Sequence, residues 1–270
     1  MSKDIKTSIP FMKMHGLGND FVIIDRRSHD VCVDSELARA MGDRHRGIGF
    51  DQLAVLEASA EADIRLTFYN ADGTTAGACG NATRCIARHE LDRAGNTSMT
   101  LLTERGLLQA TDEGDSITAV NMGHPLLDWG DVPLARQMDT LCLPIEGEPT
   151  ATGMGNPHCT FFVPDADDIL LEDYAHFEHH PLFPERTNVQ VASVVGENHL
   201  RMRVWERGVG ATLASGSSSC ATTAAAVRRG LTGKTVRVDL DGGTLWVDWR
   251  EDGLWMSGRT AHVFDGVWYP

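Results

Sequence analysis

A long internal repeat constrains the fold of this chain more than any other feature of its sequence. Four short matches recur in one order at an offset of 136 or 137 residues: GLGN at 16 with GMGN at 153, Gly73 with Gly210, Cys79-Gly80 with Ser215-Gly216, and Gly106 with Gly243. Their shared order and nearly constant offset indicate two copies of one unit. Because this period is far too long for a solenoid, the sequence predicts two pseudo-symmetric domains.

Each copy contains the same succession of strand and helix signals. A short apolar run is followed by an alternating strand, a loop of small residues, a helix and a hairpin; the matching segments are 21–25 and 159–163, 63–70 and 199–206, and 107–120 and 244–257. The helices are expected to end near Gly95 and Gly230, because glycine suits the position after a helix. The hairpins are expected to turn at Glu113-Gly114 and Asp252-Gly253. The pattern predicts a fold of the α/β (α+β) class.

The domain boundaries follow from the ends of the two copies. We expect an N-terminal domain of residues 1–122 with 259–270 and a C-terminal domain of residues 123–258, joined within the segment 121–130. The last strand, 261–268, lies beyond the second copy and could return to the first domain.

Composition excludes several functional classes. The net charge of −14 argues against non-specific binding to nucleic acid. No apolar run is long enough to cross a membrane, and the first residues lack the apolar region of a signal peptide. Six cysteines are too few for a disulfide scaffold of this size, so we expect reduced thiols and a cytoplasmic protein.

The loops that carry Cys79 and Ser215 each lead into a helix, where backbone N–H groups stabilise an anion. Cys79 is therefore expected to have a lowered pKa and to act as a base. Two matching loops facing one another across a cleft would bring one acid–base group to each side of a carbon, as inversion of a stereocentre requires. The other cysteines are expected to be small buried apolar residues, namely Cys32, Cys85, Cys142, Cys159 and Cys220.

At these residues the sequence resembles the diaminopimelate epimerases, a family of cofactor-independent racemases of lysine and peptidoglycan precursor synthesis. The matching segments, which span residues 11 to about 220, are FMKMHGLGNDFVIID, GIGFDQLAVLE, YNADGTTAGACGNATRC, MGNPHCTFFV, HHPLFPERTN and RVWERGVG. The resemblance implies two domains, each a curved, mostly antiparallel sheet wrapped around a central helix, with the active site in the cleft between them. It also implies a homodimer that needs neither a cofactor nor a metal.

The resemblance implies a set of site residues. In the family, one cysteine from each domain moves a proton; the first corresponds to Cys79, and the second falls on Ser215. His158 and Glu206 are similar to residues that the family needs for full activity. Substrate contacts fall on Asn19, Gln52, Asn70, Gly80, Asn81, Asn156, Asn188, Glu206, Arg207, Gly216 and Ser217.

Simpler roles are open for some of these residues. Asn19 and Asn156 lie in glycine-rich turns, where asparagine is common for conformational reasons. Glu206 and Arg207 could form a solvated surface pair instead of binding an ammonium and a carboxylate.

Ser215 departs from the family pattern at the second base. A serine hydroxyl is a far weaker acid than a thiol, so two-proton inversion is expected to be slow although binding should survive. The substitution is compatible with a designed change that traps substrate or with natural divergence, since Ser217, Ser218 and Ser219 also differ from the family. We expect poor epimerisation of diaminopimelate, with α-hydrogen exchange of the one epimer presented to Cys79.

Two rival functions are a racemase of the same architecture acting on another amino acid, and a non-catalytic descendant that binds an amino acid. The segment HFEHH, 176–180, could suggest a metal site, but it lacks the H-E-x-x-H spacing. The serine-rich loop is not a hydrolase nucleophile elbow, and neither glycine-rich segment matches a dinucleotide or Walker motif.

Overall fold

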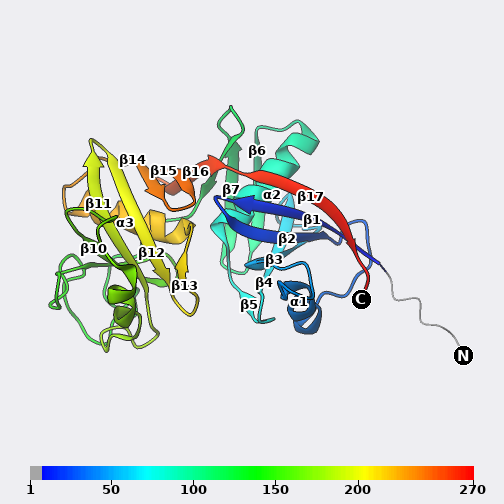
Figure 1. The fold of residues 1–270 in the computed structure, drawn as a ribbon. Coiled ribbons are helices and arrows are strands. Elements are labelled where there is room, and N and C mark those ends of the chain that lie inside the picture. Colours follow the sequence, from blue (N-terminus) through cyan, green and yellow to red (C-terminus); the bar gives the residue numbers. More distant parts are fainter. Residues whose placement is uncertain (1–7) are drawn as a thin grey trace, which may run out of the picture. The chain divides into compact units, whose positions relative to one another are not determined.

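A computed structural model describes residues 8–270, and it divides into two compact units. The first unit extends to Thr118 and includes Arg259–Pro270, and the second comprises Ala119–Gly258 (Figure 1). Both are mixed α/β structures in which strands dominate and helices are few. Among the described residues, no helix is long and apolar enough to span a membrane.

The first unit is built on a mixed sheet whose pairing order is β17, β1, β2, β3, β4, β6 and β7. The β2–β3 and β4–β6 pairs are parallel, and the others in this order are antiparallel. The elements are β1 (Ile9–Gly16), β2 (Asn19–Asp25), α1 (Ser35–Gly42), β3 (Gln52–Glu57), β4 (Ile64–Asn70), β5 (Thr75–Ala76), α2 (Gly80–Ala94), β6 (Ser98–Thr103), β7 (Gly106–Asp112) and β17 (Ala261–Trp268).

The second unit repeats this pattern with the pairing order β9, β10, β11, β12, β14, β15 and β16, and β8 pairs with β16. The elements are β8 (Ile117–Asn121), β9 (Thr150–Gly153), β10 (Pro157–Phe162), the 3-10 helix η1 (Leu171–His179), β11 (Asn188–Gly196), β12 (His199–Glu206), β13 (Gly210–Thr212), α3 (Gly216–Arg228), β14 (Thr235–Leu240), β15 (Gly243–Arg250) and β16 (Gly253–Arg259).

The strand pairings of the two units correspond to one another. The parallel pairs β10–β11 and β12–β14 repeat β2–β3 and β4–β6, and the short antiparallel partner β13 on β12 repeats β5 on β4. This correspondence is what the glycine anchors of the sequence predict. The strand β17 forms an antiparallel ladder with β1, so the end of the chain returns to the first unit.

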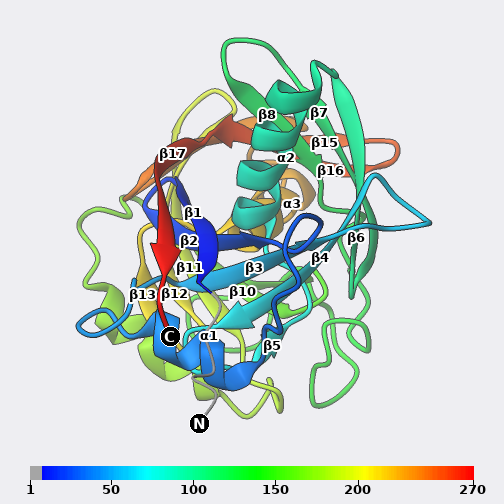
Figure 2. The ribbon, with the colours of Figure 1, turned by 90° about the vertical axis from the view of Figure 1, so that its right-hand side faces the viewer.

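Each unit holds one long helix against its sheet. The helix α2 packs on β1, β2, β6 and β7, and Figure 2 shows the strands of the first unit curving around it. The helix α3 packs on β9, β10, β11, β14 and β15. Both helices end as predicted, with Gly95 and Gly230 at a φ of +69° and their N–H groups donating to carbonyls of the last turn.

The remaining cores are aromatic and aliphatic. Phe11, Val22, Ile24 and Leu53 belong to one cluster in the first unit, and a second-unit cluster contains Val132, Leu143, Phe161 and Val189. The first cluster includes Met41 of α1, and the second includes Phe177 of η1, so each packs a further element against the strands of its unit.

The cysteines show one error in the sequence interpretation. Cys85, Cys159 and Cys220 are buried as expected, and burial raises the pKa of Cys85 to about 12. Cys32 and Cys142, however, are exposed. They lie in irregular segments outside the strands and helices, where the alternating burial of regular elements does not apply.

Candidate functional site

The first candidate half-site surrounds Cys79, the residue that precedes α2. Its backbone is extended, with φ −144° and ψ 107°, and its Sγ accepts a hydrogen bond of 3.4 Å from the N–H of Ala82. The side chain is partly exposed. A thiolate at this position is stabilised by the N–H groups of the first helical turn and by the helix dipole. Cys79 therefore occupies the position that favours a reactive thiolate.

A directional chain of amide groups lies beside this helix end. The buried Arg84 donates to Oδ1 of Asn81 (3.0 Å), and Asn81 donates through Nδ2 to Oδ1 of Asn19 (3.2 Å). Asn19 in turn donates to Oδ2 of Asp51 (2.7 Å). Each amide orientation is thus fixed by its neighbour. The structure brings together two predicted substrate residues, Asn19 and Asn81, and adds Asp51, which the sequence analysis did not identify.

Charged groups hold the turn that carries Asn19. Asp20 forms ion pairs with Lys13 and Arg44 and accepts the backbone N–H of Asp51 (3.1 Å). Burial alone would raise the pKa of Asp20, but hydrogen bonds from Arg44 and Lys13 hold it below the ordinary value of an aspartate. Asp20 therefore remains ionised and ties β1 and β2 to the segment before β3.

Gln52 and Asn70 form a second predicted pair in the same unit. They lie opposite one another in the β3–β4 ladder, and Nε2 of Gln52 donates to Oδ1 of Asn70 (3.1 Å). Asn70 also donates to the hydroxyl of Thr74 (3.0 Å). The register therefore places these two amides side by side at one end of the ladder.

The second candidate half-site surrounds Ser215, the residue that precedes α3. Its backbone is extended like that of Cys79, with φ −138° and ψ 119°, and the side chain is 4% exposed. Its hydroxyl does not cap the helix but donates to Oε2 of Glu206 (3.0 Å), while Thr212 donates to Oε1 of the same carboxylate (2.6 Å). Two predicted catalytic residues, Ser215 and Glu206, are therefore in direct contact.

His158 is fully buried in a network of hydrogen-bonding side chains. Its Nε2 lies 3.0 Å from Oδ1 of Asn156, and its Nδ1 lies 3.0 Å from Nε2 of Gln190. Gln190 also donates to the hydroxyl of Ser218 (3.0 Å) and accepts from that of Thr160 (3.1 Å). The structure thus links His158 and Asn156, both predicted from the resemblance, to Gln190 and Ser218, which were not.

Asn188 is nearly buried, and both ends of its amide bind backbone. Its Nδ2 donates to the carbonyl of Pro157 (3.0 Å), and its Oδ1 accepts the N–H of Arg207 (3.0 Å). The Arg207 side chain donates to the carbonyl of Glu185 (3.0 Å). These contacts fix the backbone around Arg207. Contact of Asn188 with a substrate stays a prediction, as do the contacts of Gly80, Gly216 and Ser217.

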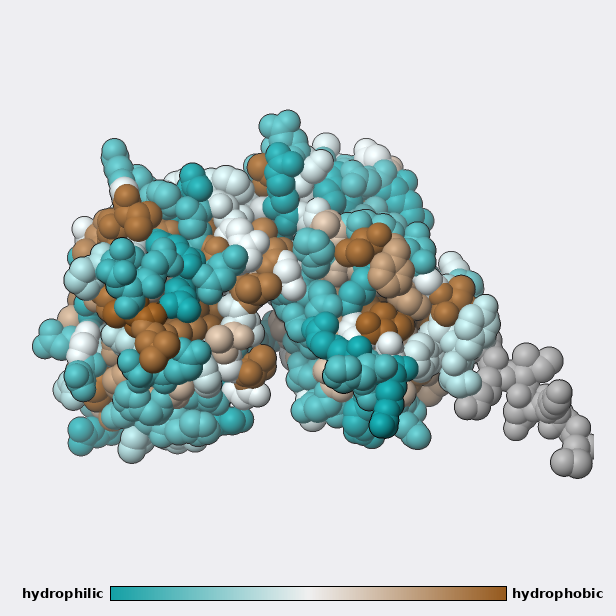
Figure 3. All heavy atoms as spheres, in the orientation of Figure 1, coloured by the Kyte–Doolittle hydropathy of each residue, from teal (hydrophilic) through white to brown (hydrophobic). Residues whose placement is uncertain are grey.

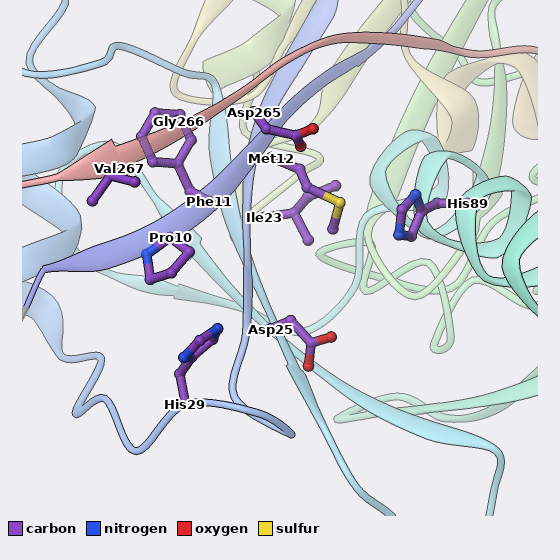
Figure 4. Close-up of a pocket in the computed structure, with 10 residues that line it drawn as sticks. All are labelled: Pro10, Phe11, Met12, Ile23, Asp25, His29, His89, Asp265, Gly266 and Val267. Atoms are coloured by element: carbon purple, nitrogen blue, oxygen red, sulfur yellow. The ribbon is translucent and has the colours of Figure 1, made fainter.

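Surface pockets within the individual units lie elsewhere. A pocket of about 420 Å³ in the first unit is lined by residues of β1, β2 and β17, among them Asp25 and Asp265, together with His29 and His89 (Figure 4). One of about 540 Å³ in the second unit includes Trp129 and Arg228. Neither is lined by Cys79, Ser215 or another predicted site residue.

The histidine-rich segment is occupied by local contacts. His176 Nδ1 lies 2.8 Å from the carbonyl of Asp173, and its ring packs on Phe177. Within residues 8–270, no three histidine, cysteine, aspartate or glutamate side chains are grouped so as to hold a metal ion. The independence from metals and cofactors that the resemblance implies stays a prediction.

Some of the site residues that the sequence analysis missed lie close in the chain to residues that it predicted. Gln190 follows Asn188 by two residues on one strand, so both side chains point to the same face. Asp51 directly precedes the predicted site residue Gln52, and Thr212 lies six residues after the predicted site residue Glu206. Their partners, however, come from other elements and emerge only in the folded chain.

Comparisons with known proteins agree on one family. A sequence model described as diaminopimelate epimerase matches residues 11–127 and 150–263. A diaminopimelate epimerase of Sphingopyxis alaskensis is 47% identical over 262 residues, covering 95% of this chain and 96% of that protein. One of Rhodospirillum centenum is 48% identical over 231 residues, covering 83% and 79%.

The fold is shared more widely. A Bacillus anthracis phenazine biosynthesis protein of the PhzF family superposes with a TM-score of 0.70, at 16% identity, covering 98% of this chain and all of that one.

Proposed function

Since the chain belongs to the diaminopimelate epimerase family, we propose that it interconverts the LL and meso forms of diaminopimelate, and does so slowly because Ser215 replaces the second thiol. The family supports an isomerase, and the substrate and the reduced rate are the proposed parts. One contact carries the proposal, namely the hydrogen bond from the Ser215 hydroxyl to the Glu206 carboxylate. It supplies the serine with a base that the sequence alone does not pair with it.

In this proposal, Cys79 and Ser215 act on opposite faces of one α-carbon, one group from each unit. The Cys79 thiolate removes the α-hydrogen of the epimer presented to it, which leaves a carbanion and a thiol. The Ser215 hydroxyl gives its proton to the other face while it receives a proton from the protonated carboxyl of Glu206. In reverse, the serine oxygen takes the α-hydrogen as its own proton passes to the Glu206 carboxylate.

The reduced rate follows from the proton affinities of these groups. An ordinary glutamate carboxylate is a weaker base than a thiolate by about four pKa units, each worth about 1.4 kcal/mol. Removal of the α-hydrogen through Ser215 and Glu206 therefore has a much smaller driving force than removal by Cys79. Donation on that face is also slow, because few glutamate carboxyls carry a proton at neutral pH. The Cys79 face keeps its thiolate base and should exchange normally.

Deuterium wash-in measured separately on LL- and meso-diaminopimelate tests the proposal. We expect exchange of one epimer at the α-carbon at a rate well above that of net epimerisation. Equal and rapid exchange from both epimers would show that Ser215 is not a weak base. A racemase for another amino acid would act on a different member of an amino-acid panel, and a non-catalytic binding protein would bind diaminopimelate without any exchange.

We also propose that the enzyme is a cytoplasmic homodimer. A thiolate base at Cys79 needs a reducing compartment. Apolar side chains gather over β1 and β17 of the first unit (Figure 3), where Phe264 and Val267 are about half exposed and Tyr269 is largely exposed. Such a patch on an outer strand fits burial against a second copy. Sedimentation equilibrium measures the oligomer, and a monomer at micromolar concentration would overturn this part.

A further inference from the structure

We propose that Gln190 is a positioning residue that acts through His158 to orient the Asn156 amide, so that Asn156 presents N–H donors to a carboxylate of the substrate. The inference rests on the proposed function for the identity of that substrate. It starts from a buried network of the second unit, in which hydrogen bonds link the side chains of Thr160, Gln190, His158 and Asn156 in turn.

The chain of hydrogen bonds has a direction. Thr160 donates to Oε1 of Gln190, which leaves the Gln190 amide nitrogen facing Nδ1 of His158 and the Ser218 hydroxyl. Because an amide nitrogen only donates, Nδ1 of His158 is an acceptor and carries no hydrogen. The imidazole hydrogen then lies on Nε2, which faces Oδ1 of Asn156 at 3.0 Å.

Burial makes this arrangement costly to disturb. Thr160, Gln190, His158 and Ser218 are all fully buried, so no water replaces a lost partner. A protonated imidazole would place an N–H against the donating amide of Gln190 and leave one of the two amide hydrogens without an acceptor, which burial penalises. The geometry therefore holds His158 neutral, with its hydrogen on Nε2.

The consequence reaches Asn156, which is partly exposed. Its Oδ1 is occupied by His158, so its remaining polar group is the Nδ2 amide with two hydrogens. Within residues 8–270 the structure gives that nitrogen no hydrogen-bond partner. Two N–H donors suit a carboxylate oxygen, whereas an ammonium group needs an acceptor. Asn156 thus selects for a carboxylate, which diaminopimelate has at both ends and lysine has at only one.

The first test reads the tautomer directly. Two-bond nitrogen–proton correlation spectra of the ¹⁵N-labelled protein at pH 7, assigned with a His158→Gln variant, distinguish hydrogen on Nε2 from hydrogen on Nδ1. We expect neutral His158 with hydrogen on Nε2. Hydrogen on Nδ1, or an imidazolium at pH 7, would overturn the inference whether or not the protein acts on diaminopimelate.

The second test changes the direction of the chain. In Gln190→Glu the carboxylate accepts from Nδ1, so His158 should carry its hydrogen there and Asn156 should turn its carbonyl toward the ligand. We expect about tenfold weaker binding of diaminopimelate by calorimetry, with little change for lysine. The matched control is Gln109→Glu, at an exposed position on β7, which should leave both affinities unchanged. An unchanged preference for diaminopimelate over lysine in Gln190→Glu would overturn the inference.

A third variant guards against misfolding of the buried glutamate. Gln190→Met removes the amide without adding charge, and signals of both neutral tautomers of His158 should then appear. Retention of the Nε2 tautomer alone would show that Gln190 does not set it. The unmodified protein could show the expected His158 tautomer and yet fail to bind diaminopimelate. That result would contradict the proposed function and not the placement of the imidazole hydrogen on Nε2.

Discussion

The N-terminal ends of α2 and α3 have nearly the same backbone but use their first side chain differently. The backbone angles of Cys79 and Ser215 differ by 6° in φ and 12° in ψ. Cys79 accepts from its own helix through Sγ, whereas Ser215 donates away from its helix to Glu206. Serine is ordinarily a good helix cap, but here the Ser215 hydroxyl is oriented toward the Glu206 carboxylate and does not accept from its own helix. The two repeats thus share the backbone conformation at this position, while the surrounding side chains determine which hydrogen bonds residue 79 or 215 forms.

The two helices also differ in how they are held. Near its C-terminal end α2 carries Glu90, which receives hydrogen bonds from Arg27 and Arg93. The helix α3 contains no acidic residue and is buried along most of its length through small side chains. The first helix thus depends partly on ion pairs, and the second on close packing.

Introducing a thiol at position 215 should have the largest effect on this comparison. Ser215→Cys provides a group that can be both thiolate base and thiol acid near neutral pH, so net epimerisation should rise by about 100-fold or more. Turnover of LL-diaminopimelate followed by NMR measures the gain. If turnover does not rise, Ser215 is not the partner of Cys79.

Removing the carboxylate beside Ser215 should affect one face of the substrate only. In Glu206→Gln the serine loses its proton acceptor, and exchange of the epimer presented to Ser215 should fall by about 100-fold. Exchange of the epimer presented to Cys79 should change far less at saturating substrate. Epimer-resolved wash-in measures both rates, and Thr212→Val, which leaves the carboxylate in place, is the milder control. An equal loss at both faces would mean that Glu206 acts in binding alone.

Acid should loosen α2 before α3. Burial would raise the pKa values of Glu90 and Asp25, but hydrogen bonds from Arg27 outweigh this and leave both below their ordinary values. Such carboxyls stabilise the fold above their unfolded pKa, and this contribution is lost as the pH falls through the folded values, which here means below about pH 4.3. Amide protection factors, which correct for the intrinsic exchange rate at each pH, should therefore fall more in α2 than in α3 between pH 5 and pH 3, since α3 has no acidic group to lose.

Arg27→Met is the matched variant for this acid effect. It should lower the free energy of unfolding by about 2 kcal/mol at pH 7 and reduce the difference between the helices in acid. An equal fall of the protection factors in α2 and α3 of the unmodified protein would contradict the assignment of the ion pairs to α2.

The smallest expected effects, those of replacing the glycine after each long helix, should be equal in the two units. Gly95 and Gly230 have the same φ of +69°, and no atom lies within 4 Å of a Cβ built at either position. Replacing either by alanine should therefore cost about 1 kcal/mol from backbone strain alone. Chemical denaturation measures both, and a clear inequality would show that the two helix ends are not equivalent.

The sequence predicted the strand order and the helix ends better than the contacts between side chains. Glycines at equivalent positions require equivalent turns, so the repeated pairings and the helix ends at Gly95 and Gly230 follow from local rules. The pairing of Asn19 with Asn81 and the role of Gln190 depend on side chains from elements far apart in the chain, which no local pattern encodes. The exposure of Cys32 and Cys142 was mispredicted for the same reason, because burial is set by what packs over a residue.

The return of β17 to β1 has a consequence for the order in which the protein folds during synthesis. Ile9 pairs with Trp268, so the first unit lacks a strand until residues 261–268 have left the ribosome. The second unit lies within Ala119–Gly258 and is complete earlier. The unit whose synthesis begins first therefore completes its sheet last, and β1 has one unpaired edge until β17 has been synthesised.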